Sequence, residues 1–347
     1  MPGIKEVAVL AGVSQATASR ALSGRGSVSE KARQRVKDAA VALGFVASYH
    51  ASSLATGRSM NIGVVVPYVD RWYFSTVLAG ITAPFMEAGY DLSLYDFQGE
   101  RHRATVMDDF LLRQRLDGVI TVGLRLGAAD VEQLLSMKVP LISLGGRLPG
   151  VDSLLVDDLA IGRLATDHLL SLGHTRIAHI GGERESTLHF HVSRARREGY
   201  ESAMAAAGLQ PLPSWSLISD YTVHGGFDAA KSLLADPYSR PTAIFCASDE
   251  MAIGTILAAR ELGLRVPEQL SVIGVDRHPL GELFGLTTVD QFADEQGKRA
   301  ADALLARIRA VPSQEEPPAP TTIDMPIRIV ARSSTLSVDA DRHVTAS

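Results

Sequence analysis

Hydrophobic positions follow two different periods along the chain. In the first 45 residues they recur at helical spacing, at 4, 7, 8 and 11 and again at 28, 32, 36, 39, 40 and 43. From residue 61 onward, apolar runs of five or six residues alternate with amphipathic stretches of a dozen or more. This change of period predicts a small all-helical head followed by an α/β body.

The head contains the start and stop signals of three short helices. Gly12 can end the first helix in the left-handed conformation, and Ser14 can cap the second by accepting from free backbone N–H groups. Ser29 and Gly44 bracket the third helix. The second helix turns Val13, Ala18, Ala21 and Leu22 inward. Its other face carries Gln15, Ala16, Ser19 and Arg20.

A short polar second helix of this kind predicts a helix-turn-helix, in which that helix enters the major groove of DNA. Gln15 is suited to adenine, and Arg20 to the O6 and N7 atoms of guanine. Thr17 and Ser19 suit phosphates and would position the helix, with Ala16 beside them on the reading face. The alternative is a plain three-helix bundle without a DNA-binding role.

The charge distribution favours the DNA-binding interpretation. Residues 1–60 contain eight Lys or Arg against three acids, a net charge of +5. The whole chain carries −5, so the remainder carries −10. A basic head on an acidic body indicates that the head, and not the body, meets a polyanion.

The body is predicted to be two doubly wound α/β lobes. Seven apolar runs have the length of buried parallel strands, and helices such as those expected over 158–174 and 292–310 separate them. This is too many strands for one small sheet, and two facing lobes would form a cleft at the carboxyl ends of their strands. The runs are 62–67, 91–96, 117–122, 140–145, 176–182, 242–248 and 270–276.

Several classes of protein are not supported by the sequence. No apolar run approaches the ~18 residues of a membrane span, and the first residues lack the features of a secretory signal. The only cysteine, Cys246, lies in an apolar run and is interpreted as a buried hydrophobe, so no disulfide is expected. Together these observations predict a cytoplasmic protein without a membrane partner.

Enzyme, cofactor and metal motifs are also missing. There is no G-x-G-x-x-G after the first body strand, no phosphate-binding G-x-x-x-x-G-K-[ST] and no G-x-S-x-G, so neither an enzyme nor a cofactor is predicted. His189 and His191 have H-x-H spacing without further ligands nearby, so no metal site is predicted. A Rossmann-like enzyme and a free solute-binding protein remain remote alternatives. The latter would need a signal peptide and no DNA-binding head.

The segment "IKEVAVLAGVSQATASRALSGRGSVSEKARQRVKDAAVALGF", starting at Ile4, resembles the head of LacI/GalR-type bacterial transcription repressors. The resemblance extends to about Ser334 and implies a body like the periplasmic sugar-binding proteins, crossed three times by the chain between its lobes. The crossings are expected near 157–162, 289–293 and 320–325. The resulting organisation is a head at 1–46, a hinge and linker at 47–60, a first lobe at 61–160 with 291–323, a second lobe at 161–290 with 324–334, and a polar tail at 335–347.

The resemblance also implies a hinge helix whose leucine wedges into the minor groove, and Leu54 takes that position. The family pattern has R-P-N ahead of the hinge and an Arg two residues before the leucine. This chain has Val46, Ala47 and Ser48, and then Ser52, so its hinge offers fewer phosphate contacts.

Six positions correspond to residues that line the family's ligand cleft. Tyr73, Phe74 and Tyr221 would supply aromatic walls, and the planar fork of Arg196 would bind hydroxyls or a carboxylate. Ser248 replaces the usual asparagine, and Asp276 would accept from paired hydroxyls.

Residues flanking those six positions are given other roles. Arg277 stands where a second Asp is common and could neutralise Asp276 or add specificity. Asp249 is interpreted as a helix cap, and Arg194 and Arg197 as solvated.

The expected function is a sequence-specific repressor that binds near-palindromic double-stranded operator DNA as a homodimer. A small effector in the cleft, most simply a sugar, would control that binding. A purine-like corepressor is the alternative effector.

Overall fold

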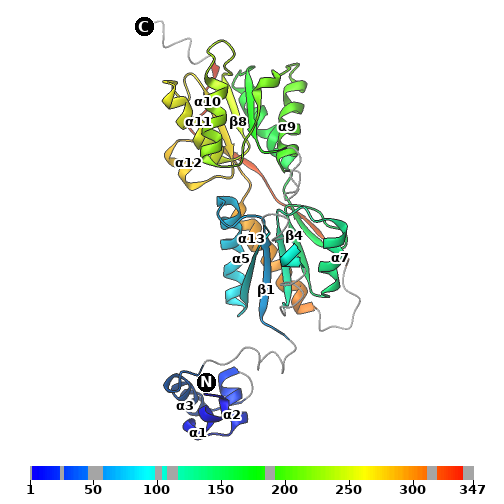
Figure 1. Cartoon of the computed structure of the whole chain (residues 1–347), viewed down its shortest axis with the longest axis vertical. Coiled ribbons are helices and arrows are strands. Elements are labelled where there is room, and N and C mark those ends of the chain that lie inside the picture. Colours follow the sequence, from blue (N-terminus) through cyan, green and yellow to red (C-terminus); the bar gives the residue numbers. More distant parts are fainter. Residues whose placement is uncertain are drawn as a thin grey trace. The chain divides into compact units, whose positions relative to one another are not determined.

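The structure, a computed structural model, describes residues 2–23, 27–45, 58–97, 104–107, 116–183, 192–310 and 319–338. The chain divides into two compact units (Figure 1). One comprises residues 1–61 with 115–117, and the other 62–114 with 118–347. Leu54, His189 and His191 lie outside the described residues.

The first unit contains three helices, α1 (Ile4–Ala11), α2 (Gln15–Ser23) and α3 (Glu30–Ala42). Their apolar faces meet in one small core around Val7, Ala18 and Val36, each fully buried. The predicted caps are confirmed. Gly12 ends α1 with φ 63°, Ser14 Oγ accepts from Thr17 N at 3.1 Å, and Ser29 Oγ accepts from Ala32 N at 3.4 Å.

In the same unit, Asp117 holds the backbone of residues 59–60 through hydrogen bonds. Asp117 accepts three hydrogen bonds, from the Ser59 backbone N–H at 2.7 Å, the Ser59 hydroxyl at 2.9 Å and the Met60 backbone N–H at 3.0 Å. Met60 has φ 52°, a strained value for a residue with a side chain. Asp117 therefore fixes the backbone just before the first strand.

The second unit begins with a six-stranded sheet in the order β11-β5-β4-β3-β1-β2. The pairs β1–β3, β3–β4, β4–β5 and β5–β11 are parallel. Helices α5 (Trp72–Glu87) and α13 (Ala293–Ala310) pack against each other beside this sheet, and α7 (Ala128–Ser136) lies elsewhere in the same lobe (Figure 1). The strands are β1 (Asn61–Val66), β2 (Asp91–Asp96), β3 (Gly118–Val122), β4 (Leu141–Leu144), β5 (Asp152–Leu155) and β11 (Thr322–Asp324).

A second six-stranded sheet follows in the order β12-β10-β9-β8-β6-β7. Only β12 pairs antiparallel, with β10. Two apolar clusters flank the sheet, one with α10 (Val223–Leu234) and α11 (Asp249–Glu261), the other with α8 (Asp158–Ser171) and α9 (Val192–Ala206). The strands are β6 (Ile177–Gly181), β7 (Ser216–Ile218), β8 (Ala243–Cys246), β9 (Ser271–Val275), β10 (Thr287–Asp290) and β12 (Arg328–Val330), with the short helices η2 (Pro213–Trp215) and α12 (Pro279–Leu283) between them.

The chain crosses three times between the two lobes. It leaves the first sheet after β5, returns to it between β10 and α13, and passes from β11 to β12 near its end. The described residues after Ser334 are held by the second lobe, since Leu336 N donates to Ser271 and Val338 N to the carbonyl of Leu172, both at 3.0 Å.

Glycines set the close approach of three helix pairs. At each pair, a Cβ added to a glycine of either helix would collide with the backbone of the partner, so the helices could not approach as they do with any larger residue. The pairs are α5–α13 with Gly80 and Gly297, α8–α9 with Gly162 and Gly199, and α10–α11 with Gly226 and Gly254.

The predicted fold class, a helix-turn-helix head and two doubly wound lobes, is confirmed. The sequence pattern missed β5, β7, β10, β11 and β12, which have three or four residues each and lie outside the seven apolar runs. The strands β4 and β8 also have four residues, but each lies within a longer apolar run, 140–145 or 242–248. Cys246 is fully buried as predicted, and burial raises the pKa of its thiol to about 12. In the described part of the chain, no helix is long and apolar enough to cross a membrane.

Candidate functional site

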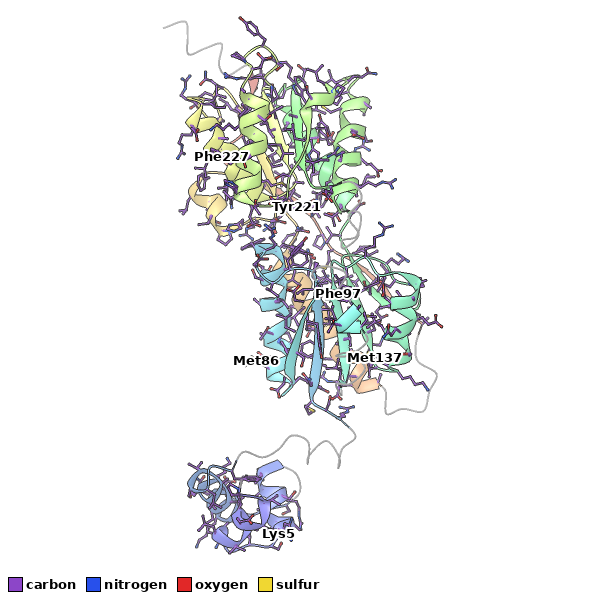
Figure 2. The ribbon with its side chains drawn as sticks, viewed as in Figure 1. Lys5, Met86, Phe97, Met137, Tyr221 and Phe227 are labelled. Carbon is purple, nitrogen blue, oxygen red and sulfur yellow. The ribbon has the colours of Figure 1, made fainter. Side chains whose placement is uncertain are left out.

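The second unit contains a partly open cavity of about 880 Å³. Its lining comes mainly from segments that follow strands of both sheets, including Tyr68 after β1, Gly182 after β6 and Asp276 after β9. The carboxyl ends of parallel strands are the usual place for ligands in doubly wound folds. Tyr221 lies at the edge of the second lobe that faces the first (Figure 2).

All six residues predicted for the ligand cleft line this one cavity: Tyr73, Phe74, Arg196, Tyr221, Ser248 and Asp276. They come from α5, α9, the loop before α10, the N-cap of α11 and the loop after β9. The structure thus brings together residues spread over two hundred positions of the sequence.

Aromatic rings form one wall of the cavity. The rings of Tyr73 and Phe74 meet edge to face with centroids 5.2 Å apart, and Tyr68 lies 6.0 Å from Phe74. A Cβ at Gly123 would touch the Phe74 ring, so the absence of a side chain there makes room for it. Such rings offer flat apolar faces to a ligand.

Arg196 is buried, with 4% of its surface exposed, and two of its nitrogens bond to protein groups. Its Nε donates to Asp158 Oδ1 at 2.8 Å and its Nη1 to the Ala247 carbonyl at 2.6 Å. Burial raises the pKa of Asp158, and Arg196 opposes that effect. Because Asp158 already balances this guanidinium, the pair presents little net positive charge to the cavity.

Asp276 is the most buried acid of the cavity lining, with 7% of its surface exposed. Gln291 Nε2 donates to its Oδ1 at 2.5 Å. Burial raises the pKa of Asp276 to about 7, with Arg196 and Gln291 acting in the opposite direction. The residue has φ 119°, a strained backbone conformation of the kind that gathers at functional sites.

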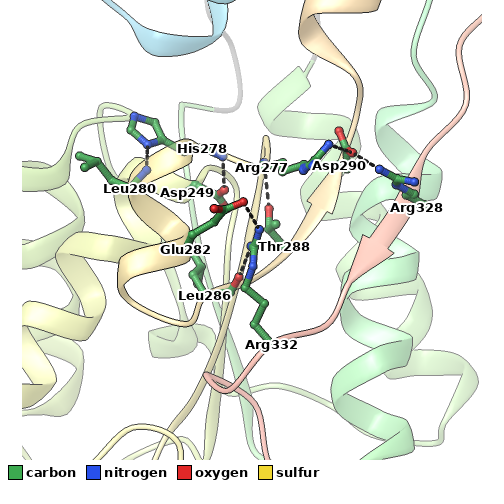
Figure 3. A network of polar contacts seen from close by, with 10 residues as sticks. All are labelled: Asp249, Arg277, His278, Leu280, Glu282, Leu286, Thr288, Asp290, Arg328 and Arg332. Carbon is green, nitrogen blue, oxygen red and sulfur yellow. Dashed lines mark hydrogen bonds and ion pairs between the residues drawn. The ribbon is translucent and has the colours of Figure 1, made fainter.

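Arg277 does not neutralise Asp276, contrary to the sequence interpretation. Its Nη1 pairs with Asp290 at 3.4 Å, and Arg328 reaches the same carboxylate oxygen at 3.1 Å (Figure 3). Asp290 ends β10, directly before the chain returns to the first lobe. The arginine therefore stabilises the crossing segment, while the partner of Asp276 is the Gln291 amide.

Two other interpretations of neighbouring residues are also wrong. Ser248, not Asp249, caps α11, since its hydroxyl accepts from Met251 N at 3.3 Å. Asp249 is fully buried and accepts instead from His278 N at 2.7 Å (Figure 3). Arg197 is 6% exposed and not solvated, whereas Arg194 is exposed and pairs with Glu198 at 2.7 Å.

Several cavity residues were not predicted. Asp158 accepts from Arg196, and Gln291 donates to Asp276. These partners are distant in the sequence and meet only in the folded chain. Glu250 could have been noticed, because it follows the predicted Ser248 by two positions at a helix start. The others that bear polar groups are Tyr68, Arg71, Glu183, Ser193, Ser219, Asp220 and Asp228.

The head presents a second candidate surface on α2. Gln15, Ala16, Ser19 and Arg20 are exposed there, and Thr17 is half-buried. Thr17 Oγ1 lies 2.8 Å from Ser14 Oγ, and Arg20 Nε donates to the Ala16 carbonyl at 3.2 Å. The side chains that the sequence assigned to DNA thus share the solvent-facing side of one helix.

Comparisons with known proteins agree with this architecture. Residues 3–48 match the bacterial regulatory proteins of the lacI family, and residues 166–335 match the periplasmic binding protein-like domain. The chain is 33% identical over 321 residues to the ribose operon repressor of Escherichia coli K12, covering 91% of this chain and 96% of the repressor. It is 31% identical over 339 residues to the HTH-type transcriptional repressor PurR of Glaesserella parasuis, covering 96% and 98%.

Among solved structures, the lac repressor dimer bound to operator and the anti-inducer ONPF superposes with a TM-score of 0.80. The sequence identity is 27%, over 96% of this chain and 99% of that one. The chain therefore belongs to the lacI family of bacterial regulatory proteins. It is a DNA-binding transcriptional repressor of this family and not an enzyme.

Proposed function

We propose that this repressor binds a specific operator through α2 and that an uncharged, polyhydroxylated effector, a carbohydrate, controls the binding from the cavity. The observation that carries the effector assignment is the shared lining. Aromatic faces, a buried acid and a hydrogen-bonded arginine surround one space of about 880 Å³, and a sugar presents apolar C–H faces and hydroxyls to such groups.

The charge of the cavity supports an uncharged effector. Among the described lining residues there are six carboxyl groups and two guanidinium groups. One of the two, Arg196, is balanced by Asp158 at 2.8 Å. A phosphorylated or carboxylated sugar would therefore meet unpaired like charge in a desolvated site, which is costly.

A purine-like corepressor is the second candidate. The similarity to the ribose operon repressor and to PurR is nearly equal, at 33% and 31% identity, so overall identity does not choose between effectors. The aromatic wall of Tyr68, Tyr73 and Phe74 would also stack on a base.

On the DNA side, Gln15 and Arg20 would read base edges, while Thr17 and Ser19 would contact phosphates and Ala16 would pack against a thymine methyl. Leu54 would enter the minor groove as a wedge. The exposure of the α2 face supports the first group.

The proposed assembly is a homodimer on a near-palindromic operator in the cytoplasm, and the solved lac repressor dimer on its operator supports it by analogy. We retain the predicted division into a head, a hinge, two lobes and a tail. Effector binding would change the closure of the two lobes and hence the joint fit of two heads to two half-sites, by its differential affinity for the two states.

A thermal-shift series tests the effector class. Full-length protein is melted with D-ribose, D-ribose 5-phosphate, D-ribonate and hypoxanthine, each over a range of concentrations. A ligand present at 100 times its Kd stabilises the native state by about 2.7 kcal/mol. Stabilisation by the neutral sugar but not by its phosphate or acid supports the proposal. Stabilisation by hypoxanthine alone selects the purine-like alternative, and stabilisation by the anions contradicts the charge argument.

A further inference from the structure

The N-terminus of α5 lies at the cavity and lacks a cap from its own lobe. Arg71 is its N-cap residue and makes no side-chain capping hydrogen bond. The first intrahelical bond is from Ser75 N to the Arg71 carbonyl at 3.0 Å, so the backbone N–H groups of Trp72, Tyr73 and Phe74 have no partner within the helix.

A carboxylate of the second lobe lies near this N-terminus. It belongs to Glu250, in the first turn of α11, and is close to the Trp72 backbone N–H. Glu250 is half-buried and lines the cavity. A carboxylate at the positive end of a helix is stabilising, and here it comes from the opposite lobe.

A second contact joins the same residue to the second lobe. The indole of Trp72 and the imidazole of His278 lie with centroids 5.0 Å apart and planes at 44°. His278 is held in place from behind, since its Nδ1 accepts from Leu280 N at 3.0 Å and its backbone N–H donates to buried Asp249 at 2.7 Å (Figure 3).

His278 also belongs to the segment that follows β9 and carries the cavity acid. Asp276, Arg277 and His278 are consecutive, and each is anchored differently: to Gln291, to Asp290 and to Asp249. A ligand that moves Asp276 would therefore move the residue that holds Trp72.

We propose that Glu250 and His278 are positioning residues that hold the two lobes together by capping α5 and packing on Trp72, and so set the closure of the cavity before any effector binds. We call this pair of contacts, Glu250 at the start of α5 and His278 on Trp72, the latch. Its regulatory role rests on the effector-binding function proposed above. Loss of the cap or of the ring contact shifts the equilibrium from closed toward open lobes by about tenfold, which corresponds to about 1.4 kcal/mol.

The test uses the full chain, whose two tryptophans are both replaced by 5-fluorotryptophan. Trp72 reports the latch. Trp215 lies 7% exposed in the core of the second lobe and reports whether that lobe is folded. The two ¹⁹F resonances are assigned with Trp72→Phe. No effector and no DNA are needed, so failure of the latch is distinguishable from failure of the proposed function.

Glu250→Ala is the decisive variant, because the proposed cap acts on the Trp72 backbone and not on its ring. It is expected to move the Trp72 resonance toward that of His278→Ala and to increase the radius of gyration in small-angle scattering. Glu250→Gln keeps an acceptor and should restore the wild-type signal. Glu261→Ala removes an exposed acid at the other end of α11 and serves as the matched control. Trp215 should not move in any of them.

An unchanged Trp72 resonance and radius of gyration in Glu250→Ala would overturn the proposal. Should Glu250→Ala misfold, as Trp215 would reveal, amide hydrogen exchange of the unaltered protein decides. The Trp72 amide is then expected to exchange at least about tenfold more slowly than an unprotected amide. Exchange at the unprotected rate contradicts the latch.

Discussion

Gln291 donates from its side-chain amide to Oδ1 of Asp276 at 2.5 Å. Gln291 belongs to the segment by which the chain returns from the second lobe to the first, and Asp276 follows the strand β9 of the second lobe. Gln291 also accepts, through its backbone carbonyl, from Gln296 at 2.6 Å, and Gln296 accepts from the Tyr73 hydroxyl at 2.7 Å. Opposite sides of the cavity are thus joined through an interlobe crossing.

The ionisation of Asp276 is expected to make stability fall with rising pH. Burial raises its pKa to about 7 from an ordinary value of 3.8, so the folded state holds a proton that the unfolded chain has lost. The stabilising contribution is complete below 3.8, declines as the pH rises toward about 7, and is absent above it. Each pKa unit corresponds to about 1.4 kcal/mol, so the total is a few kcal/mol.

Asp276→Asn isolates this contribution, since every other titrating group stays in place. The free energy of unfolding is measured by urea denaturation across that pH range. The free energy of unfolding of the wild type minus that of the variant should decrease as the pH rises and become constant above about 7. A difference that is constant over the whole range contradicts the buried, raised-pKa carboxyl. In wild type, a sugar that donates hydroxyls to the carboxylate should bind more tightly as the pH rises through the same value.

Arg196 is expected to be essential for folding stability as well as for the cavity. Arg196→Ala leaves Asp158 buried without its partner, which costs about 3–5 kcal/mol. Arg196→Lys keeps the charge but cannot reproduce the fork that reaches both Asp158 and the Ala247 carbonyl, so about 1–3 kcal/mol is lost. Thermal and urea unfolding measure the loss of stability in each of the two variants.

The matched control lies on the same helix. Arg194→Ala removes an exposed ion pair with Glu198 and should change stability by no more than about 1 kcal/mol. Equal effects of the Arg194 and Arg196 substitutions would show that burial of the Arg196–Asp158 pair is not what matters.

Gly162→Ala should destabilise the protein, although alanine in a helix is ordinarily more stabilising than glycine by about 0.5–1 kcal/mol. A Cβ at this position collides with the backbone carbonyl of Arg196 on α9, so the helices must separate. We expect a net loss of about 1–3 kcal/mol and weaker effector binding, because Arg196 moves with α9. A stabilised variant would refute the packing argument.

Arg20→Ala should reduce operator specificity. A bidentate contact to guanine is worth about 1–3 kcal/mol of discrimination against the wrong base. Fluorescence anisotropy on a selected operator and on scrambled duplex gives the ratio of the two affinities. Lys37→Ala is the control, since Lys37 is exposed on α3. It should lower both affinities alike if it acts at all. An unaltered ratio for Arg20→Ala rules out base reading by Arg20.

Leu54→Ala provides the corresponding test of the proposed wedge. It should weaken operator binding while leaving binding to scrambled duplex unchanged, because a wedge contributes only on a bent specific site. Equal losses on both duplexes in the same anisotropy assay would exclude this role.

The head was predictable from sequence because its signals are local. The caps Ser14 and Ser29 and the stop at Gly12 act within three or four residues of themselves. The six cavity residues were predicted through resemblance to a family, and no local pattern would have grouped Tyr73 with Asp276. Strands that lie within longer apolar runs were visible, including the four-residue strands β4 and β8, whereas the short strands outside such runs were not.

What the sequence could not give was the choice of partner for buried charges. Arg277 is adjacent to Asp276 and has a left-handed backbone, with φ 59°, yet its side chain binds Asp290. Arg197 was interpreted as solvated, like Arg194. It is buried because the face of α9 that carries it packs inward. Such choices are made by tertiary packing, which residue order alone does not specify.

The central claim is that the basic head binds operator DNA and that a ligand in the cavity controls this binding. Fluorescence anisotropy tests it most directly, with full-length protein and a chain lacking residues 1–60 titrated onto a selected operator and a scrambled duplex, with and without D-ribose or the ligand found by thermal shift. We predict that the full-length protein prefers the operator by at least about a thousandfold. The ligand should change that affinity by about 5- to 150-fold, and the shortened chain should bind neither duplex. Equal binding to both duplexes, or unchanged binding after removal of the head, would contradict the account.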